Sequence, residues 1–205
     1  MRTLIVVDVQ NDFLPGGSLA VKEGEVIVPI VNRLRSEYDQ VIFTQDWHPP
    51  THKSFAANHP GRKPGEVVDL DGLPQVLWPV HCVQGTAGAK FHKDLIVKPG
   101  EAVFRKGTDP SIDSYSAFYD NAHRKSTGMA DYLRHQGIKE VALCGLATDY
   151  CVKFTALDAI TDGFECVLIA DACRAVELKP GDGDAAIDAM RGAGVAICDS
   201  GDLGV

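Results

Sequence analysis

The sequence predicts a three-layer α/β fold, in which a mainly parallel sheet has helices on both faces. Two observations predict it. Short apolar runs bounded by turn residues recur along the chain, and segments with helical spacing of apolar residues lie between several of them. Strands of a parallel sheet are buried on both faces and therefore read as continuous apolar runs, and alternation of strand and helix favours parallel pairing.

The expected strands, in chain order, are residues 4–9, 41–44, 102–104, 141–144, 166–170 and 195–198. The expected helices are residues 26–38, 129–135, 148–161 and 185–191. Residues 47–100 are rich in Pro, Gly and His with little periodicity, and a long irregular segment of this kind is usually functional or disordered. Because no repeat or linker-like segment interrupts the pattern, residues 1–205 are expected to form one domain.

Charge and composition exclude several classes of partner. The chain has 28 acidic and 20 basic residues, and its net charge of -8 offers no attraction to nucleic acid or to an anionic membrane. The first apolar run is too short for a signal peptide, and the six cysteines lack the spacing of a small disulfide scaffold. We therefore expect a cytoplasmic protein without nucleic-acid or membrane partners. The oligomeric state stays open, a homo-oligomer included.

One cysteine lies at a predicted strand-to-helix turn. Cys151 follows the strand that ends at Cys144, and Thr148 has the residue type of a helix N-cap. This assignment places Cys151 in the first helical turn, where free N–H groups and the helix dipole favour ionisation of a thiol. The N–H groups of Cys151 and Ala147 are then placed to stabilise an oxyanion. The alternative is a small apolar residue that packs the helix against the sheet.

Two charged residues also lie at strand ends. Asp8 ends the first apolar run, and Lys106 closes the run that begins at Ala102. Ligands of parallel sheets bind beyond the carboxyl ends of the strands, so Asp8, Lys106 and Cys151 are expected at one edge. Asp8 is the candidate base, and the Lys106 ammonium would stabilise both the thiolate and the carboxylate. Taken singly, Asp8 is also explained as a turn cap and Lys106 as a solvated surface residue.

Asp46, His48 and His81 form a candidate metal site. Asp46 and His48 directly follow a predicted strand, and alternate side chains of an extended chain point to the same side. His81, from the irregular segment, supplies a third ligand. Two histidines and one carboxylate leave coordination positions open, and they indicate one divalent ion, Zn²⁺ or Fe²⁺, with Mn²⁺ as a further candidate. Whether His52 is another ligand stays undecided.

Several stretches together resemble the nicotinamidase branch of the isochorismatase-like cysteine hydrolases, over nearly the whole chain. They are residues 7–13, 46–49, 78–82, 104–107, 113–118 and 145–151. By this resemblance the catalytic triad consists of Asp8, Lys106 and Cys151, and the peptide bond between Leu146 and Ala147 is cis. The resemblance also assigns the metal to the three ligands named above.

The resemblance implies hydrolysis of nicotinamide to nicotinate and ammonia through a thioester on the cysteine, as in NAD salvage, with pyrazinamide as a further substrate. It places Phe13, Trp78, Tyr115 and Ala147 around the substrate ring, although each aromatic residue is also explained as core. A related amidase acting on a carbamoyl or ureido substrate would keep the triad, but the metal ligands argue against it. Isochorismate cleavage is a third alternative, but it needs no cysteine nucleophile, so Cys151 argues against it. From a different class, a non-catalytic metal-binding module with redox-sensing cysteines stays an alternative.

Overall fold

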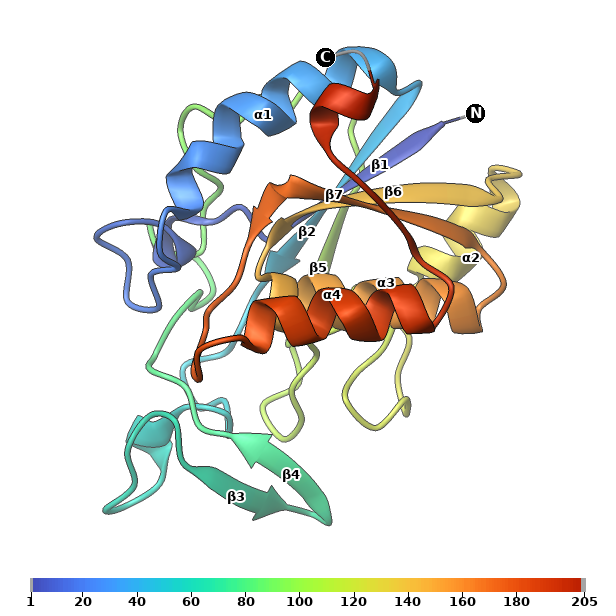
Figure 1. Ribbon diagram of the computed structural model, residues 1–205. Coiled ribbons are helices and arrows are strands. Elements are labelled where there is room, and N and C mark those ends of the chain that lie inside the picture. The colour runs from blue at the N-terminus through green and yellow to red at the C-terminus, as the bar shows by residue number, and fades with distance from the viewer. Residues whose placement is uncertain (1, 204–205) are drawn as a thin grey trace.

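The computed structural model describes residues 2–203, and its centre is a six-stranded sheet (Figure 1). The strands that form it are β1 (Thr3–Val7), β2 (Gln40–Asp46), β5 (Val103–Lys106), β6 (Glu140–Leu146), β7 (Glu165–Arg174) and β8 (Ala196–Cys198). Their order across the sheet is β5-β2-β1-β6-β7-β8, and every neighbouring pair is parallel. The predicted fold class is confirmed.

Helices cover both faces of this sheet. Figure 1 shows α1 (Ile27–Leu34) on one side of the sheet and α3 (Lys153–Thr161) with α4 (Asp182–Gly192) on the other. The short α2 (Met129–His135) packs near the β5 edge, where Tyr132 contacts the ring of Phe104. Buried residues of α1 recur at helical spacing, as the sequence predicted. None of the helices within residues 2–203 combines the length and the apolar character needed to cross a membrane.

The strand order determines where a ligand can bind. The central strand β1 is buried along its whole length, which explains why its sequence is a continuous apolar run. From β1 the chain continues to β2 on one side, and it later returns to β6 on the other side. A crevice forms beyond the carboxyl ends of strands where the order diverges in this way. The ends of β2, β1 and β6 should therefore frame the site.

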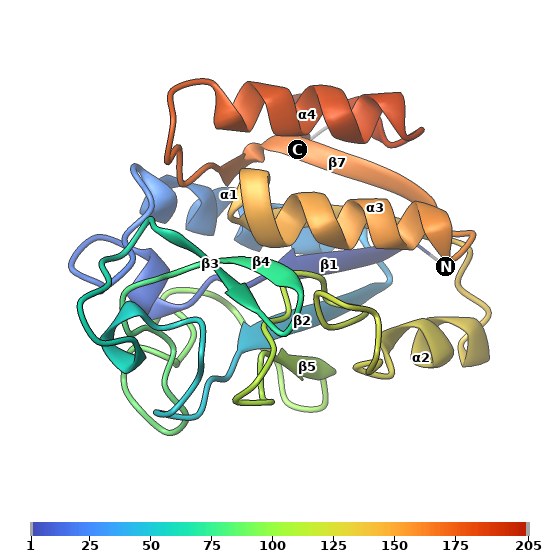
Figure 2. The same ribbon diagram turned by 90° about the horizontal axis from the view of Figure 1, so that it is seen from below.

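The structure corrects two predictions about the N-terminal half. The first strand ends at Val7 instead of residue 9, because Asp8 has a φ of 48° and turns the chain out of the sheet. The irregular segment 47–100 contains an antiparallel hairpin of β3 (Val67–Leu70) and β4 (Leu73–Val76), which forms a sheet of its own below the main sheet in Figure 1 and in front of it in Figure 2. The two turn residues between these strands, Asp71 and Gly72, both have positive φ. Asp-Gly is a strong hairpin signal that our prediction overlooked.

Candidate active site and metal centre

Three side chains from separate strand ends meet in a buried cluster. Asp8 follows β1, Lys106 ends β5, and Cys151 lies in the turn after β6. They are 0%, 2% and 7% exposed, respectively. Lys106 Nζ lies 2.8 Å from Asp8 Oδ2 and donates a hydrogen bond to Cys151 Sγ at 3.2 Å. An acid, an amine and a thiol are thus in mutual reach, in the arrangement expected from the sequence.

The Lys106 ammonium also reaches a second carboxylate. It donates to Asp46 Oδ1 and, at 3.1 Å, to the backbone oxygen of Ser114. The strand register explains the first contact, because Asp46 of β2 and Lys106 of β5 are direct partners. Burial alone would lower the pKa of Lys106, but Asp46 and Asp8 raise it well above its usual value. The lysine therefore stays charged and joins Asp8, Asp46 and Cys151.

The acid and the thiol of this cluster are both poorer at losing protons than free side chains. Burial raises the pKa of Asp8, and the neighbouring Lys106 offsets only part of this. Thr44 Oγ1 holds the carboxylate by donating to Asp8 Oδ1 at 2.6 Å. Burial likewise raises the pKa of Cys151 well above its usual value, in spite of the lowering effect of Lys106. The neutral thiol is the resting form, and its ionisation requires a base.

The raised pKa of Cys151 contradicts the expectation that the helix start makes this thiol more acidic. Burial, together with the nearby carboxylates of Asp8 and Asp46, raises the pKa of the thiol more than Lys106 lowers it. The predicted cap is also wrong: Ala147 occupies the N-cap position, and Thr148–Val152 form one π-helical turn before α3 begins. The sequence pattern located the turn but not its hydrogen bonding, since a π turn has no distinctive residue signature.

The backbone before Cys151 has the geometry that the resemblance implied. The peptide bond between Leu146 and Ala147 is cis. The Ala147 carbonyl accepts hydrogen bonds from Tyr150 and Val152, each at 3.1 Å, whereas its N–H has no hydrogen-bond acceptor among residues 2–203. Ala147 and Cys151 line the same pocket. A free N–H donor therefore lies beside the thiol, where an oxyanion would need one.

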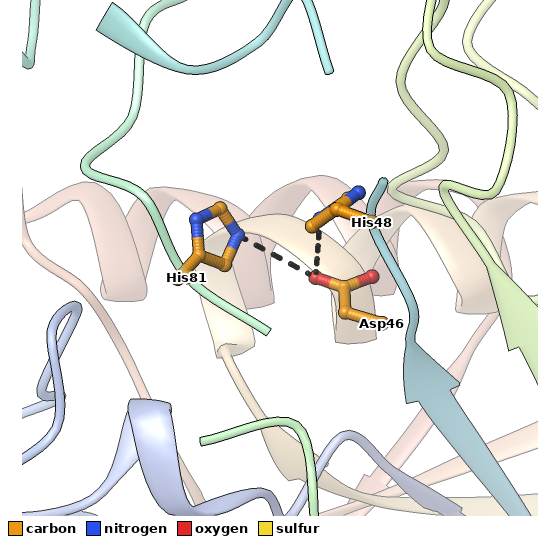
Figure 3. Close-up of side chains that lie close together, drawn as sticks. All are labelled: Asp46, His48 and His81. Atoms are coloured by element: carbon orange, nitrogen blue, oxygen red, sulfur yellow. Dashed lines mark ion pairs between the residues drawn. The ribbon is translucent and has the colours of Figure 1, made fainter. Parts of the chain in front are cut away.

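Asp46, His48 and His81 converge next to this cluster. Figure 3 shows both imidazole rings beside the same carboxylate, with His48 Nε2 at 3.5 Å and His81 Nε2 at 3.8 Å from Asp46 Oδ2. All three residues are at least 96% buried. Burial would raise the pKa of Asp46, but Lys106 and His48 hold it well below its usual value, so the carboxylate is ionised.

The hydrogen bonds of the two histidines leave one nitrogen of each available for a metal ion. His48 Nδ1 lies 2.8 Å from the Gly107 oxygen, and His81 Nδ1 lies 2.7 Å from the Pro79 oxygen. A carbonyl only accepts, so each Nδ1 carries the proton and each Nε2 keeps its lone pair. His48 Nε2 is buried and has no hydrogen-bond partner among the described residues. The donor set fits a divalent ion with N and O ligands.

The family of the chain follows from comparison with known proteins. Residues 2–202 match the isochorismatase domain family. The nicotinamidase of Escherichia coli K12 is 49% identical over 200 residues, which cover 96% of this chain and 93% of that protein. This chain belongs to the isochorismatase family, in its nicotinamidase branch. A solved nicotinamidase/pyrazinamidase of Acinetobacter baumanii is 48% identical, with a TM-score of 0.95 and coverage of 98% of this chain and 97% of that chain.

Two other solved members of the nicotinamidase branch contain ligands. The yeast nicotinamidase bound to the inhibitor nicotinaldehyde is 32% identical, with a TM-score of 0.90 and coverage of 97% of this chain and 100% of that chain. The pyrazinamidase of Pyrococcus horikoshii in complex with zinc is 36% identical, with a TM-score of 0.79 and coverage of 97% and 98%. Relatives of this isochorismatase-family chain thus bind zinc and a nicotinamide-like ligand.

In this member of the branch, a small pocket is lined by Cys151 of the thiol cluster and by Asp46 and His81 of the metal-ligand candidates. It encloses about 370 Å³ of space between the protein atoms, open solvent at its mouth included. Its lining includes every residue that we predicted to surround a substrate ring, namely Phe13, Trp78, Tyr115 and Ala147. Trp78 Nε1 donates to the Tyr115 hydroxyl at 3.1 Å, which fixes the two rings edge to face. These aromatic rings and the Cys151 thiol thus lie around one pocket.

The same pocket has walls that the sequence interpretation missed. They are Leu19, Asp113, Tyr150 and Val176. Tyr150 had a usable signal, because it precedes Cys151 in the turn. Val176 had none: it follows β7, and its position depends on Asp149, whose carboxylate accepts hydrogen bonds from the backbone N–H groups of Val176 and Glu177 at 2.9 Å.

His52 is not part of the three-residue group around Asp46. Its ring packs 4.4 Å from that of His48, and a second cluster contains both rings and Asp113. Both ring nitrogens of His52 already have protein partners: Nδ1 lies 2.7 Å from Ser54 Oγ, and Nε2 lies 3.2 Å from the Ile112 oxygen. His52 therefore supports His48 by packing and has no lone pair left over for the ion.

We expect Gly107→Ala to weaken zinc binding, and to weaken it more than Gly100→Ala does. Gly107 has a φ of 62°, and a Cβ there would overlap the His48 ring, whose orientation the Gly107 carbonyl also fixes. Gly100→Ala is the matched control, because Gly100 has a φ of 88° and open space around it. Both substitutions carry the backbone cost of about 1 to 2 kcal/mol for a left-handed residue with a Cβ. Equal zinc affinities of the two variants, measured by chelator competition, would refute the steric role.

Proposed function

We propose that this protein is a metal-dependent nicotinamidase, which hydrolyses nicotinamide to nicotinate and ammonia and also accepts pyrazinamide. The observation that carries the proposal is one pocket lined by Cys151, by Asp46 and His81 of the metal group, and by aromatic rings. A carbamoyl or ureido substrate has no ring for these aromatic walls and no ring nitrogen for a metal ion.

In the proposed first half-reaction, Asp8 removes the thiol proton of Cys151 as the sulfur attacks the carboxamide carbon. A carboxylate oxygen of Asp8 lies within 4.8 Å of the sulfur, and the raised pKa of Asp8 makes it a stronger base than a surface carboxylate. The Lys106 ammonium, 3.2 Å from the sulfur, stabilises the developing thiolate. The new C–S bond converts the carbonyl to an oxyanion, which the N–H groups of Ala147 and Cys151 stabilise.

The tetrahedral species then collapses. The C–N bond breaks, the proton held by Asp8 passes to the leaving nitrogen, and ammonia and a thioester on Cys151 remain. In the second half-reaction, Asp8 accepts a proton from water as the oxygen attacks the thioester carbon, and the C–S bond breaks. Cys151 regains a proton from Asp8, and the carboxylic acid leaves and gives its proton to the solvent, which yields nicotinate.

Asp46, His48 and His81 would hold the divalent ion, for which Zn²⁺ or Fe²⁺ are the first candidates and Mn²⁺ the next. When bound, the ion supplies a Lewis-acidic position that suits a ring nitrogen and so orients the ring. Asp46 also contacts the Lys106 ammonium through its other oxygen. The residue that serves the metal centre thereby positions the amine that serves the thiol.

The test is ammonia release from nicotinamide, pyrazinamide and an N-carbamoyl amino acid, before and after removal of metal with a chelator. We expect release from the two ring carboxamides only, its loss after metal removal, and its recovery when Zn²⁺, Fe²⁺ or Mn²⁺ is returned. Metal content is measured in parallel. If only the carbamoyl compound released ammonia, the protein would be a carbamoyl or ureido amidase instead. Full activity of the metal-free protein would show that hydrolysis does not require the ion.

A further inference from the structure

Gln10 is a buried residue with no part in the reaction described above. Strand β1 pairs with β2 only as far as Val6 and Phe43, because Asp8 turns the chain away. Strand β2 continues to Asp46, three residues beyond the last pair. In a parallel strand, the N–H and C=O of one residue point toward the same neighbouring strand. Beyond the end of β1, the N–H and C=O of Asp46 have no backbone partner on that side among residues 2–203.

The side chain of Gln10 takes the place of the missing strand. Its Oε1 accepts a hydrogen bond from the Asp46 N–H at 2.8 Å, and its Nε2 donates to the Asp46 carbonyl at 2.8 Å. Nε2 also donates to the Ala89 carbonyl at 2.9 Å. Gln10 is 0% exposed, so no water competes for these bonds. A carboxamide matches a peptide group in donor and acceptor, and no other side chain except asparagine offers both in this form.

On its other side the end of β2 has an ordinary strand partner. The Trp47 N–H donates to the Lys106 carbonyl of β5 at 3.0 Å. The backbone that carries Asp46 is thus held by β5 on one side and by a single side chain on the other. The Asp46 carboxylate must face Lys106 with one oxygen and both histidines with the other. A small rotation of this peptide would disturb both relations.

We propose that Gln10 is a positioning residue for the metal centre, because its carboxamide substitutes for the absent strand and fixes the Asp46 peptide. The inference rests on the proposed metal site. Gln10 acts through the Asp46 peptide and not through contact with substrate or ion. Loss of the carboxamide should lower metal affinity by roughly 10- to 100-fold, the range seen when groups that orient a metal ligand are removed.

The test compares Gln10→Met with Gln45→Met. Gln45 is the matched control, since it is also a buried glutamine and its Nε2 donates to the same Ala89 carbonyl at 2.8 Å, but its side chain does not hold the Asp46 peptide. Zinc affinity of the wild type and both variants is measured by competition with a chromophoric chelator. The absorption spectrum with Co²⁺ reports the ligand geometry. Gln10→Glu, which keeps the acceptor for the Asp46 N–H, is made in addition in case Gln10→Met does not fold.

We expect weaker zinc binding and an altered cobalt spectrum for Gln10→Met, a smaller loss for Gln10→Glu, and wild-type values for Gln45→Met. Equal affinities of the Gln10 and Gln45 variants, with a wild type that binds zinc and hydrolyses nicotinamide, would overturn the positioning role and leave the proposed function standing. A wild type that hydrolyses nicotinamide but binds no divalent ion would overturn the metal site and this inference together.

Discussion

Cys151→Ala is expected to lower nicotinamide hydrolysis by at least about a thousandfold, because it removes the sulfur that forms the thioester. The side chain is buried beside Lys106 and Asp8, and no other cysteine lines the pocket within the described residues. The loss should appear in kcat, measured by ammonia release. Zinc affinity should stay close to that of the parent, since Cys151 is not one of the three proposed ligands Asp46, His48 and His81.

Cys198→Ala controls for the general effect of losing a thiol. Cys198 lies in β8, at the far edge of the sheet from β5, and is only half-buried. We expect this variant to retain parental activity. If Cys151→Ala turned over nicotinamide at the parental rate, the covalent route would be wrong, and direct attack by water would have to replace it.

Lys106→Met is expected to affect stability as well as activity. It leaves Asp8 and Asp46 buried without their shared cation, and removing one partner of a buried ion pair costs about 3 to 5 kcal/mol. Without Lys106, the pKa values of both carboxyl groups rise. A group whose pKa is higher in the folded state than in the unfolded state loses stability as pH rises through that range. The destabilisation should therefore be larger at neutral than at acidic pH, as measured by urea unfolding at both.

Two further variants test whether the effect of Lys106→Met is specific to the buried cluster. Lys125→Met removes the cation of an exposed pair with Asp109 and should change the unfolding free energy little, because solvent screens that pair. Lys106→Met combined with Asp8→Asn should recover part of the lost stability without recovering activity, since one uncompensated charge is removed together with the base. Equal effects of Lys106→Met and Lys125→Met would show that the buried cluster does not depend on its ammonium.

The sheet and the positions of its charged strand ends could be predicted because the burial of a strand restricts which residues its sequence can contain. A strand buried on both faces must be apolar, as β1 is, so a charge at its end, as at Asp8, stands out. The same holds for Asp46 after β2 and Lys106 at the end of β5. Parallel strands present their carboxyl ends at one edge, and this rule, together with the family resemblance, predicted that Asp8, Lys106 and Cys151 lie together.

Other features could not be predicted because they depend on contacts between distant segments. The acidity of Cys151 is set by the burial and the charges around it, not by its place in a turn. Val176 reaches the pocket only through the hydrogen bonds of Asp149. In the sequence, Gln10 looks like an ordinary polar loop residue after a strand. Its role can be inferred only from the structure, in which the end of β2 extends past the end of β1. Each case needs the fold before the chemistry can be assigned.

The strand order also bears on how the molecule is completed during its synthesis. Strand β1 is made first, but its second neighbour, β6, belongs to the last third of the chain. Until β6 emerges, the central strand has an open edge, and pairing between such distant segments is slow. Because Cys151 follows directly after β6, Asp8, Lys106 and the three metal-ligand candidates are all synthesised before the strand that covers the open edge of β1 and before the thiol that joins them.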